Sequence, residues 1–217
     1  DHGEYIIYDL FTARNKRKIP NDYYVWWGFE DSKLFSFAKE EIIRLSQDTA
    51  PFNFTLLTVD THNIGGYFCE LCNNEHNSQY ENVLSCSSRQ TVDFINWLKK
   101  QDFYENTTII VCGDHPSMDD QYIETHYDGS KPRKVYNCFI NIADLGQINS
   151  KNREFNTLDF FPTTLAALGC KISGERLGLG TNLFSQKQTL SEKYGNDKIN
   201  EEFSKSSIFY RKNILRE

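Results

Sequence analysis

Short apolar runs of strand length alternate with amphipathic segments along most of the chain. The runs FTLLTV at 54–59, TTIIVC at 107–112 and VYNCFINI at 135–142 are rich in β-branched residues, a pattern typical of strands buried on both faces. Apolar residues at helical spacing predict helices over about 34–46, 79–100 and 157–168. Buried strands interleaved with helices indicate an α/β fold with a largely parallel central sheet.

The charge of the chain and its aromatic content exclude two classes of protein. With 24 Lys and Arg against 30 Asp and Glu, the formal charge is −6, which argues against nucleic-acid binding because that requires a basic surface. Aromatic residues make up 14% of the chain and can fill a core, so we do not expect disorder. No apolar run approaches the roughly 18 residues of a membrane helix. The start, DHGEYIIYDL, has neither an initiator Met nor a signal peptide, and we interpret it as a cut edge.

Three of the six cysteines lie close together in the sequence: Cys69, Cys72 and Cys86. We favour a disulfide, with Cys72 and Cys86 as the preferred pair, which would place the protein outside the cytoplasm. Zinc binding and free thiols stay open, and His76 is the only nearby candidate for a fourth zinc ligand. The other three cysteines lie in apolar contexts and are expected to be buried: Cys112, Cys138 and Cys170.

Polar clusters directly follow two of the predicted strands. The strand at 54–59 runs into Asp60-Thr61-His62, and the strand at 107–112 runs into Gly113-Asp114-His115. Ligands of open α/β sheets bind beyond the carboxyl ends of the strands, so both clusters are site candidates. An aspartate oxygen with an imidazole nitrogen suits Zn²⁺ or Mn²⁺ better than Ca²⁺.

Each of these residues also has a purely structural interpretation. Asp114 can cap a turn and His115 can be a hydrogen-bonded loop histidine, without any metal. His62 can hold a turn, or it can bind a phosphate oxygen and pass a proton. The basic run of Lys131, Arg133 and Lys134 is either a solvated loop, which we favour, or an anion site. No nucleophile stands in a known motif: the chain has no Gly-x-Ser-x-Gly elbow and no Gly-rich phosphate loop.

Several longer motifs follow one another along the chain. They are WGFED at 27–31, TVDTH at 58–62, YENVLSCS at 80–87, FINW at 94–97, NTTIIVCGDHPSM at 106–118 and RLGLGTNLFS at 176–185. In this order they resemble the sulfatase-like phosphoglycerol transferases of the alkaline phosphatase superfamily, over about residues 23–186. The resemblance implies a three-layer sandwich with a largely parallel central sheet. We therefore expect residues 1–186 to be the C-terminal part of such a catalytic domain and residues 187–217 to be a polar tail.

The resemblance also implies a function and a set of site residues. The family transfers phosphoglycerol from a phospholipid donor to a glycan or polyol-phosphate acceptor, outside the cytoplasm at the cell membrane, usually with Mn²⁺; Mg²⁺ and Zn²⁺ are alternatives. Its metal-binding Asp-His pair matches Asp114 and His115. Its substrate-contacting histidine, the catalytic candidate, matches His62, and Trp27 and Asp60 are further candidates for substrate binding.

Other family features have no counterpart in this sequence. The threonine nucleophile, a glutamate metal ligand and several membrane helices lie upstream in family members. We therefore expect these 217 residues to carry an incomplete site and to be inactive alone. The alternatives are a sulfatase or phosphodiesterase of the same superfamily, in which water resolves the intermediate, and a phosphoethanolamine transferase.

Overall fold

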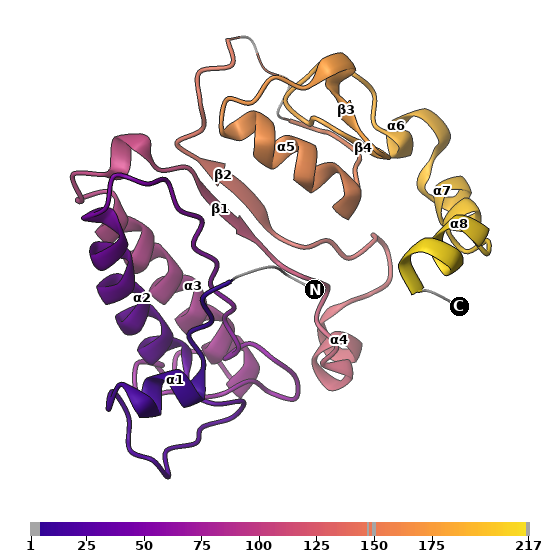
Figure 1. Cartoon of the computed structure of the whole chain (residues 1–217). Helices are drawn as coiled ribbons and strands as arrows, with labels where there is room; N and C mark the ends of the chain where they lie inside the picture. Colours follow the sequence, from indigo (N-terminus) through magenta and orange to yellow (C-terminus); the bar gives the residue numbers. More distant parts are fainter. Residues whose placement is uncertain (1–4, 147, 149–150, 216–217) are drawn as a thin grey trace. The chain divides into compact units, whose positions relative to one another are not determined.

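The computed structural model describes residues 5–146, 148 and 151–215, and the chain divides into two compact units (Figure 1). Unit 1 comprises Asp1–Glu105 and Gly113–Val135, and unit 2 comprises Asn106–Cys112 and Tyr136–Glu217. Each unit has its own cluster of buried apolar side chains. Every candidate site residue lies in unit 1.

Unit 1 is built around two long helices. Its helices are α1 Leu10–Asn15, α2 Asp31–Ser46, α3 Gln79–Leu98 and α4 Asp120–His126. Both long helices confirm the predictions from apolar spacing, and they pack through Phe35 and Phe94, whose ring centroids lie 5.0 Å apart. A capping box of Ser78 and Glu81 starts α3.

The start of α2 is joined to the segment before His62 by two buried carboxyl groups. Asp60 Oδ1 accepts the backbone N–H of Asp31 at 3.1 Å, and Asp31 Oδ1 accepts the backbone N–H of Val59 at 2.7 Å. Asp31 is 0% exposed and Asp60 is 1% exposed. Burial and the neighbouring Asp31 charge raise the pKa of Asp60 to about 7, and burial also raises the pKa of Asp31.

The strand predicted over residues 54–59, in unit 1, is wrong. These residues form no strand, and Leu57 is 71% exposed. Within the described residues, the segment 54–59 has no neighbouring strand to pair with, so its apolar character alone does not produce a β-strand. Its end is instead fixed by the bond from Val59 to Asp31.

Unit 2 contains the two strands whose positions the sequence predicts correctly, although their residues are half-buried or exposed and not buried on both faces. Strand β1 (Ile109–Cys112) pairs with β2 (Asn137–Ile140) in antiparallel register, Ile109 opposite Ile140. The short strands β3 (Arg176–Leu177) and β4 (Gly180–Thr181) form a second antiparallel pair. The structure is thus of mixed helices and strands, as the α/β class requires, but in the residues it describes both sheets are two-stranded and antiparallel. The largely parallel sheet of a three-layer sandwich is not confirmed.

A helix covers part of unit 2 and supplies its core. The 3₁₀ turn Thr157–Asp159 leads into α5 (Phe160–Ala167), which confirms the helix predicted over 157–168. Ala166 and Ala167 pack with Phe184, whose ring meets that of Phe139 edge-on at 5.5 Å.

The C-terminal segment begins as an integral part of unit 2. Its helical elements are α6 Leu190–Tyr194, α7 Asn196–Phe203, α8 Ile208–Tyr210 and the π-helical turn Arg211–Leu215. The nearly buried Arg153 forms an ion pair with Glu192 at 2.6 Å, and Thr189 donates to the carbonyl of Glu154. The boundary predicted between residues 186 and 187 stays a prediction. Among the described residues, no helix combines the length and apolar character needed to cross a bilayer.

We expect Asp60→Asn to reduce the pH dependence of the free energy of unfolding. The ordinary pKa of Asp is 3.8, and in the folded chain that of Asp60 is about 7, so the folded state keeps a proton that the unfolded state releases. Stability that is fully present below about pH 4 is therefore lost as the pH rises through about 7. Asn keeps the oxygen that accepts the Asp31 N–H but does not ionise. Between about pH 4 and pH 7, the free energy of unfolding of the variant should therefore rise by more than about 1 kcal/mol relative to that of the wild type.

Urea unfolding at several pH values measures this difference. Asp93→Asn, at an exposed position on α3, is the control for removing one carboxylate. Equal pH dependence of the wild type and Asp60→Asn would contradict the prediction.

Candidate functional site

A tight turn presents Trp27 beside His62. Val25 and Gly28 exchange two backbone hydrogen bonds of 3.0 and 2.8 Å, and Trp26 between them adopts a left-handed φ of 54°. Trp27 is 65% exposed, and its ring centroid lies 4.4 Å from that of His62 at an interplanar angle of 48°. An exposed indole against an imidazole forms a surface that a bound molecule can contact.

The neighbouring backbone fixes the tautomer of His62. Its Nδ1 lies 2.7 Å from the carbonyl oxygen of Asn63. Because a carbonyl only accepts, Nδ1 carries the hydrogen and the neutral ring leaves Nε2 unprotonated. His62 Nε2 can therefore take a proton from an oxygen of a bound molecule, or donate one when the ring is charged.

The loop that carries His62 closes against α3. The backbone N–H of Tyr67 donates to the carbonyl of Asp60 at 2.8 Å. Gly66 permits this closure, because its φ is 64° and an added Cβ would lie 2.6 Å from the Asp60 oxygen and 2.7 Å from Val83. The carboxylate of Asp60 binds the start of α2, so the contact of Asp60 with substrate stays a prediction.

Asp114 and His115 lie together at the surface, directly after β1. Asp114 Oδ1 accepts the backbone N–H of His115 at 2.9 Å, and Asp114 Oδ2 lies 3.4 Å from His115 Nε2. The carbonyl of Pro116, 2.9 Å away, accepts from His115 Nδ1, so the neutral ring keeps a lone pair on Nε2. An oxygen and a nitrogen this close, with the second ring nitrogen held by a backbone carbonyl, fit two ligands of one divalent metal ion.

A third ligand is not supplied nearby. In the part of the chain that the structure describes, no His, Cys, Asp or Glu side chain joins Asp114 and His115 in a group of three or more converging ligand atoms. The structure thus brings the two predicted metal ligands together, and the incomplete site stays a prediction.

Tyr80 on α3 connects the two candidate loops. Its hydroxyl donates to the carbonyl of Thr61 at 3.1 Å and lies 2.8 Å from the hydroxyl of Ser117, from which it can accept. Thr61 precedes His62 by one residue, and Ser117 follows His115 by two. One buried hydroxyl therefore ties the His62 loop to the Asp114–His115 loop.

Asp119 makes a second connection between the same loops. Its Oδ2 accepts the backbone N–H of Gly65 at 2.6 Å, and its Oδ1 accepts that of Tyr122 at 3.0 Å, which caps α4. Sequence reasoning missed Asp119 and Tyr80. An Asp before a short helix is a capping signal that could have found Asp119, whereas Tyr80 looked like any other apolar position of its helix.

The basic run borders the loop that follows His115. The guanidinium of Arg133 donates to the carbonyl of Ser117 at 2.6 Å. A shallow depression there is lined by Pro116, Ser117, Lys131, Arg133 and Lys134, among others. The structure therefore places the three cationic residues of the predicted run around a depression shared with Pro116 and Ser117, the residues that follow His115.

The cysteines differ from expectation. All six are free, so the favoured disulfide between Cys72 and Cys86 is not formed in this structure. Cys112 and Cys170 are exposed, contrary to the prediction that they are buried, because Cys112 ends its strand and Cys170 follows the end of α5.

Comparisons with known proteins agree with the motifs. A family model described as Sulfatase matches residues 3–170. Phosphoglycerol transferase I of Citrobacter koseri is 30% identical over 200 residues, which are 87% of this chain and 25% of that protein. The proteins of the same name from Salmonella choleraesuis and Escherichia fergusonii are each 30% identical, over 88% and 79% of this chain and over 25% and 22% of their own lengths. The chain thus spans about a quarter of these curated relatives. No solved structure matches it.

We expect Tyr80→Phe to lower the free energy of unfolding by about 1–2 kcal/mol, because two hydrogen bonds of a buried hydroxyl are lost. Backbone amide resonances should shift in both candidate loops, at Thr61–His62 and at His115–Ser117. Chemical denaturation and two-dimensional NMR measure the two effects. Tyr24→Phe, at an exposed tyrosine, is the control. Shifts confined to α3 would show that the hydroxyl does not connect the loops.

Proposed function

This chain belongs to the sulfatase family, and we propose that it forms part of a metal-dependent enzyme that transfers phosphoglycerol from a lipid donor to a glycan or polymer acceptor. The observation that carries the proposal is the Tyr80 bridge, which sets an exposed Trp–His pair and an Asp–His pair on connected loops. The names of the relatives support the choice of phosphoglycerol as the transferred group. Because the chain spans about a quarter of those relatives, the activity belongs to the longer protein.

Asp114 and His115 would hold the metal ion, with Mn²⁺ expected and Mg²⁺ or Zn²⁺ as alternatives. The anionic oxygen and the neutral imidazole nitrogen are ligands that Mn²⁺ accepts. When bound, such an ion stabilises negative charge on phosphoryl oxygens. The bond from His115 Nδ1 to the Pro116 carbonyl keeps Nε2 directed for this role.

His62 would act on the phosphoglycerol group. With Nδ1 bound to the Asn63 carbonyl, His62 can bind a phosphoryl or glycerol oxygen only through Nε2, which gives it one defined direction for proton transfer. Trp27 would pack against the glycerol moiety and exclude water on one side of His62. We propose that the nucleophile, a threonine in this family, comes from outside these 217 residues.

The basic run would contact the anionic donor. Lys131 and Lys134 border the loop that follows His115, and Arg133 is held there by its bond to Ser117. Cationic side chains near a membrane surface attract anionic headgroups. From the family resemblance, we propose that the domain works on the extracytoplasmic side of the cell membrane, anchored by helices of the longer protein.

In the longer enzyme, we expect Asp114→Ala and His115→Ala each to abolish metal-dependent transfer, because either change removes one of two ligands. His62→Ala should lower turnover by about 10²–10⁴-fold, the usual contribution of a general acid or base, while Mn²⁺ affinity is retained. Release of phosphoglycerol from a labelled phospholipid to an acceptor measures turnover, and isothermal titration measures Mn²⁺ binding.

The exposed His76 provides the matched control, and His76→Ala should retain transfer. The 217-residue chain alone should show no turnover, so robust phosphodiesterase activity from it would contradict the incomplete site. Full activity of His115→Ala would contradict the metal assignment. Release of the group to water without an acceptor would favour the hydrolase alternative.

We expect the double change Lys131→Ala and Lys134→Ala to raise the KM for an anionic phospholipid donor about tenfold or more. The reason is that each basic residue near an anionic surface is worth about 1 kcal/mol. Increasing salt should reduce the difference from the wild type. The double change Lys99→Ala and Lys100→Ala, at exposed residues after α3, removes the same charge and is the control. An equal effect of both pairs would mean that overall charge, not this run, binds the donor.

A further inference from the structure

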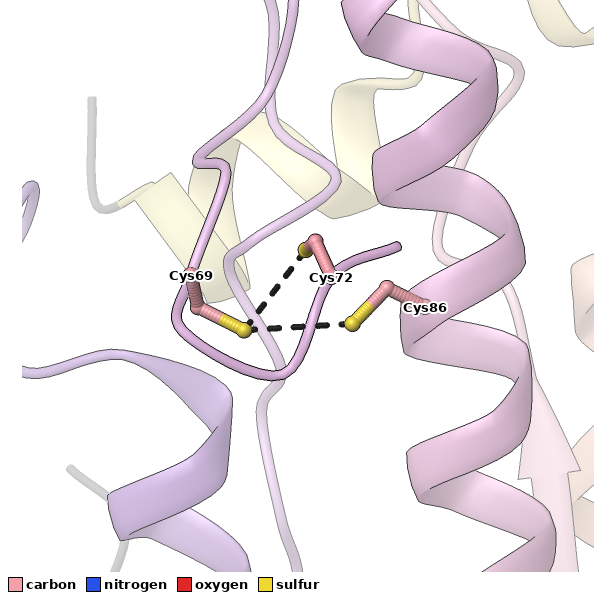
Figure 2. A group of neighbouring side chains, drawn as sticks. All are labelled: Cys69, Cys72 and Cys86. Atoms are coloured by element: carbon pink, nitrogen blue, oxygen red, sulfur yellow. Dashed lines mark hydrogen bonds between the residues drawn. The ribbon is translucent and has the colours of Figure 1, made fainter. Parts of the chain in front are cut away.

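Three cysteine sulfurs converge between a loop and α3, away from the residues assigned to transfer. Cys69 and Cys72 come from the loop, and Cys86 comes from the helix (Figure 2). Their Sγ atoms all lie within 4.8 Å of one another. We propose that Cys69, Cys72 and Cys86 form a three-thiolate site for Zn²⁺ that fastens this loop to α3.

The spacing of the sulfurs matches that of zinc thiolates. Zn–S bonds are about 2.3 Å long, so two sulfurs at corners of a tetrahedron around zinc lie about 3.8 Å apart. Cys69 Sγ lies 3.6 Å from Cys72 Sγ and 3.8 Å from Cys86 Sγ. A disulfide would require about 2.05 Å between two of the sulfur atoms and would leave the third cysteine unpaired. The arrangement is thus close to that needed for a shared ion.

One side-chain N–H donor lies beside the buried sulfurs. Cys69 is 3% exposed and Cys86 is 1% exposed. The side-chain amide of Gln90, one turn beyond Cys86, directs Nε2 at Cys86 Sγ over 3.5 Å and at Cys69 Sγ over 3.7 Å. An N–H donor shared by two sulfurs stabilises thiolates better than thiols, as donors around metal-bound sulfur do.

Burial raises the pKa of Cys69 and of Cys72. Zinc is bound by thiolates, so its binding releases the protons that the thiols carry. The site is distinct from the Asp114–His115 pair, because softer thiolate ligands select zinc over Mn²⁺. His76 lies outside the group of converging ligand atoms, so water or a small exogenous ligand would occupy the fourth position.

The ion would complete an existing set of contacts between this loop and α3. Arg89 donates to the carbonyl of Leu71 at 2.7 Å, and Asn82 Oδ1 accepts the backbone N–H groups of Glu75 and His76, both at 2.8 Å. The Arg89 contact holds the Cys69–Cys72 turn itself, and Cys86 lies between Asn82 and Arg89 along α3. Zinc would fix both ends of this turn to the helix, and this role requires no catalytic function.

The 217-residue chain, purified anaerobically with a reductant that contains no thiol, tests the proposal. We expect one zinc ion per chain by elemental analysis, released by a chelator and lost in Cys69→Ser and Cys86→Ser. The control Cys112→Ser with Cys170→Ser, at the two exposed cysteines, should keep the ion. Zinc bound equally by the variants and the control would overturn the proposal.

A second measurement needs no variant and holds even where Cys86→Ser fails to fold. Titration of the apo chain with Co²⁺ should give an intense thiolate-to-cobalt charge-transfer band and release about three protons per ion. Absence of the band would overturn the proposal. Alkylation and mass spectrometry that find two of these cysteines joined as a disulfide, in protein purified without a reductant, would also overturn it.

Discussion

The buried carboxyl groups of Asp31 and Asp60 hold together the start of α2 and the segment before His62. A buried carboxyl beside another is costly, and it is tolerated where each carboxyl accepts a backbone N–H that burial would otherwise leave without a partner. Asp31 and Asp60 do this for each other's segments, across 28 and 29 residues of sequence. The loop that carries His62 begins at Asp60, so the position of the candidate catalytic imidazole depends on groups beneath the surface.

The site itself is assembled from loops, and its geometry comes from what lies behind them. Trp27, His62, Asp114 and His115 are all solvent-accessible to some degree, and none belongs to a regular strand or helix. Tyr80 and Asp119 supply the connections from buried positions. Such an arrangement lets the exposed groups contact a bulky ligand while hydrogen bonds from the buried residues below keep them in place.

The sequence allowed the helices and the candidate residues to be predicted, but not their connections. The helical spacing of apolar residues predicted α2, α3 and α5, because the buried face of an amphipathic helix is formed by residues of the helix itself. Residues 54–59 were mistaken for a strand because pairing depends on a partner that periodicity cannot reveal. The Asp114–His115 pair was found because its members are adjacent, whereas Tyr80 joins residues 19 and 37 positions away. The disulfide was expected from cysteine spacing, which does not distinguish a bond from a set of ligands.

One face of α3 supports three features of unit 1. Tyr80 holds the two site loops, Val83 packs on Gly66, and Cys86 with Gln90 meets the sulfurs of the cysteine loop. These residues recur at intervals of three or four and so lie in one stripe. A helix turns about 100° per residue, so one inserted or deleted residue within the stripe would rotate some of these contacts away from the others. A substitution in this segment changes one contact, whereas an insertion or deletion between residues 80 and 90 changes several contacts together. Length variation among related chains should therefore fall in the loops and spare this segment of α3.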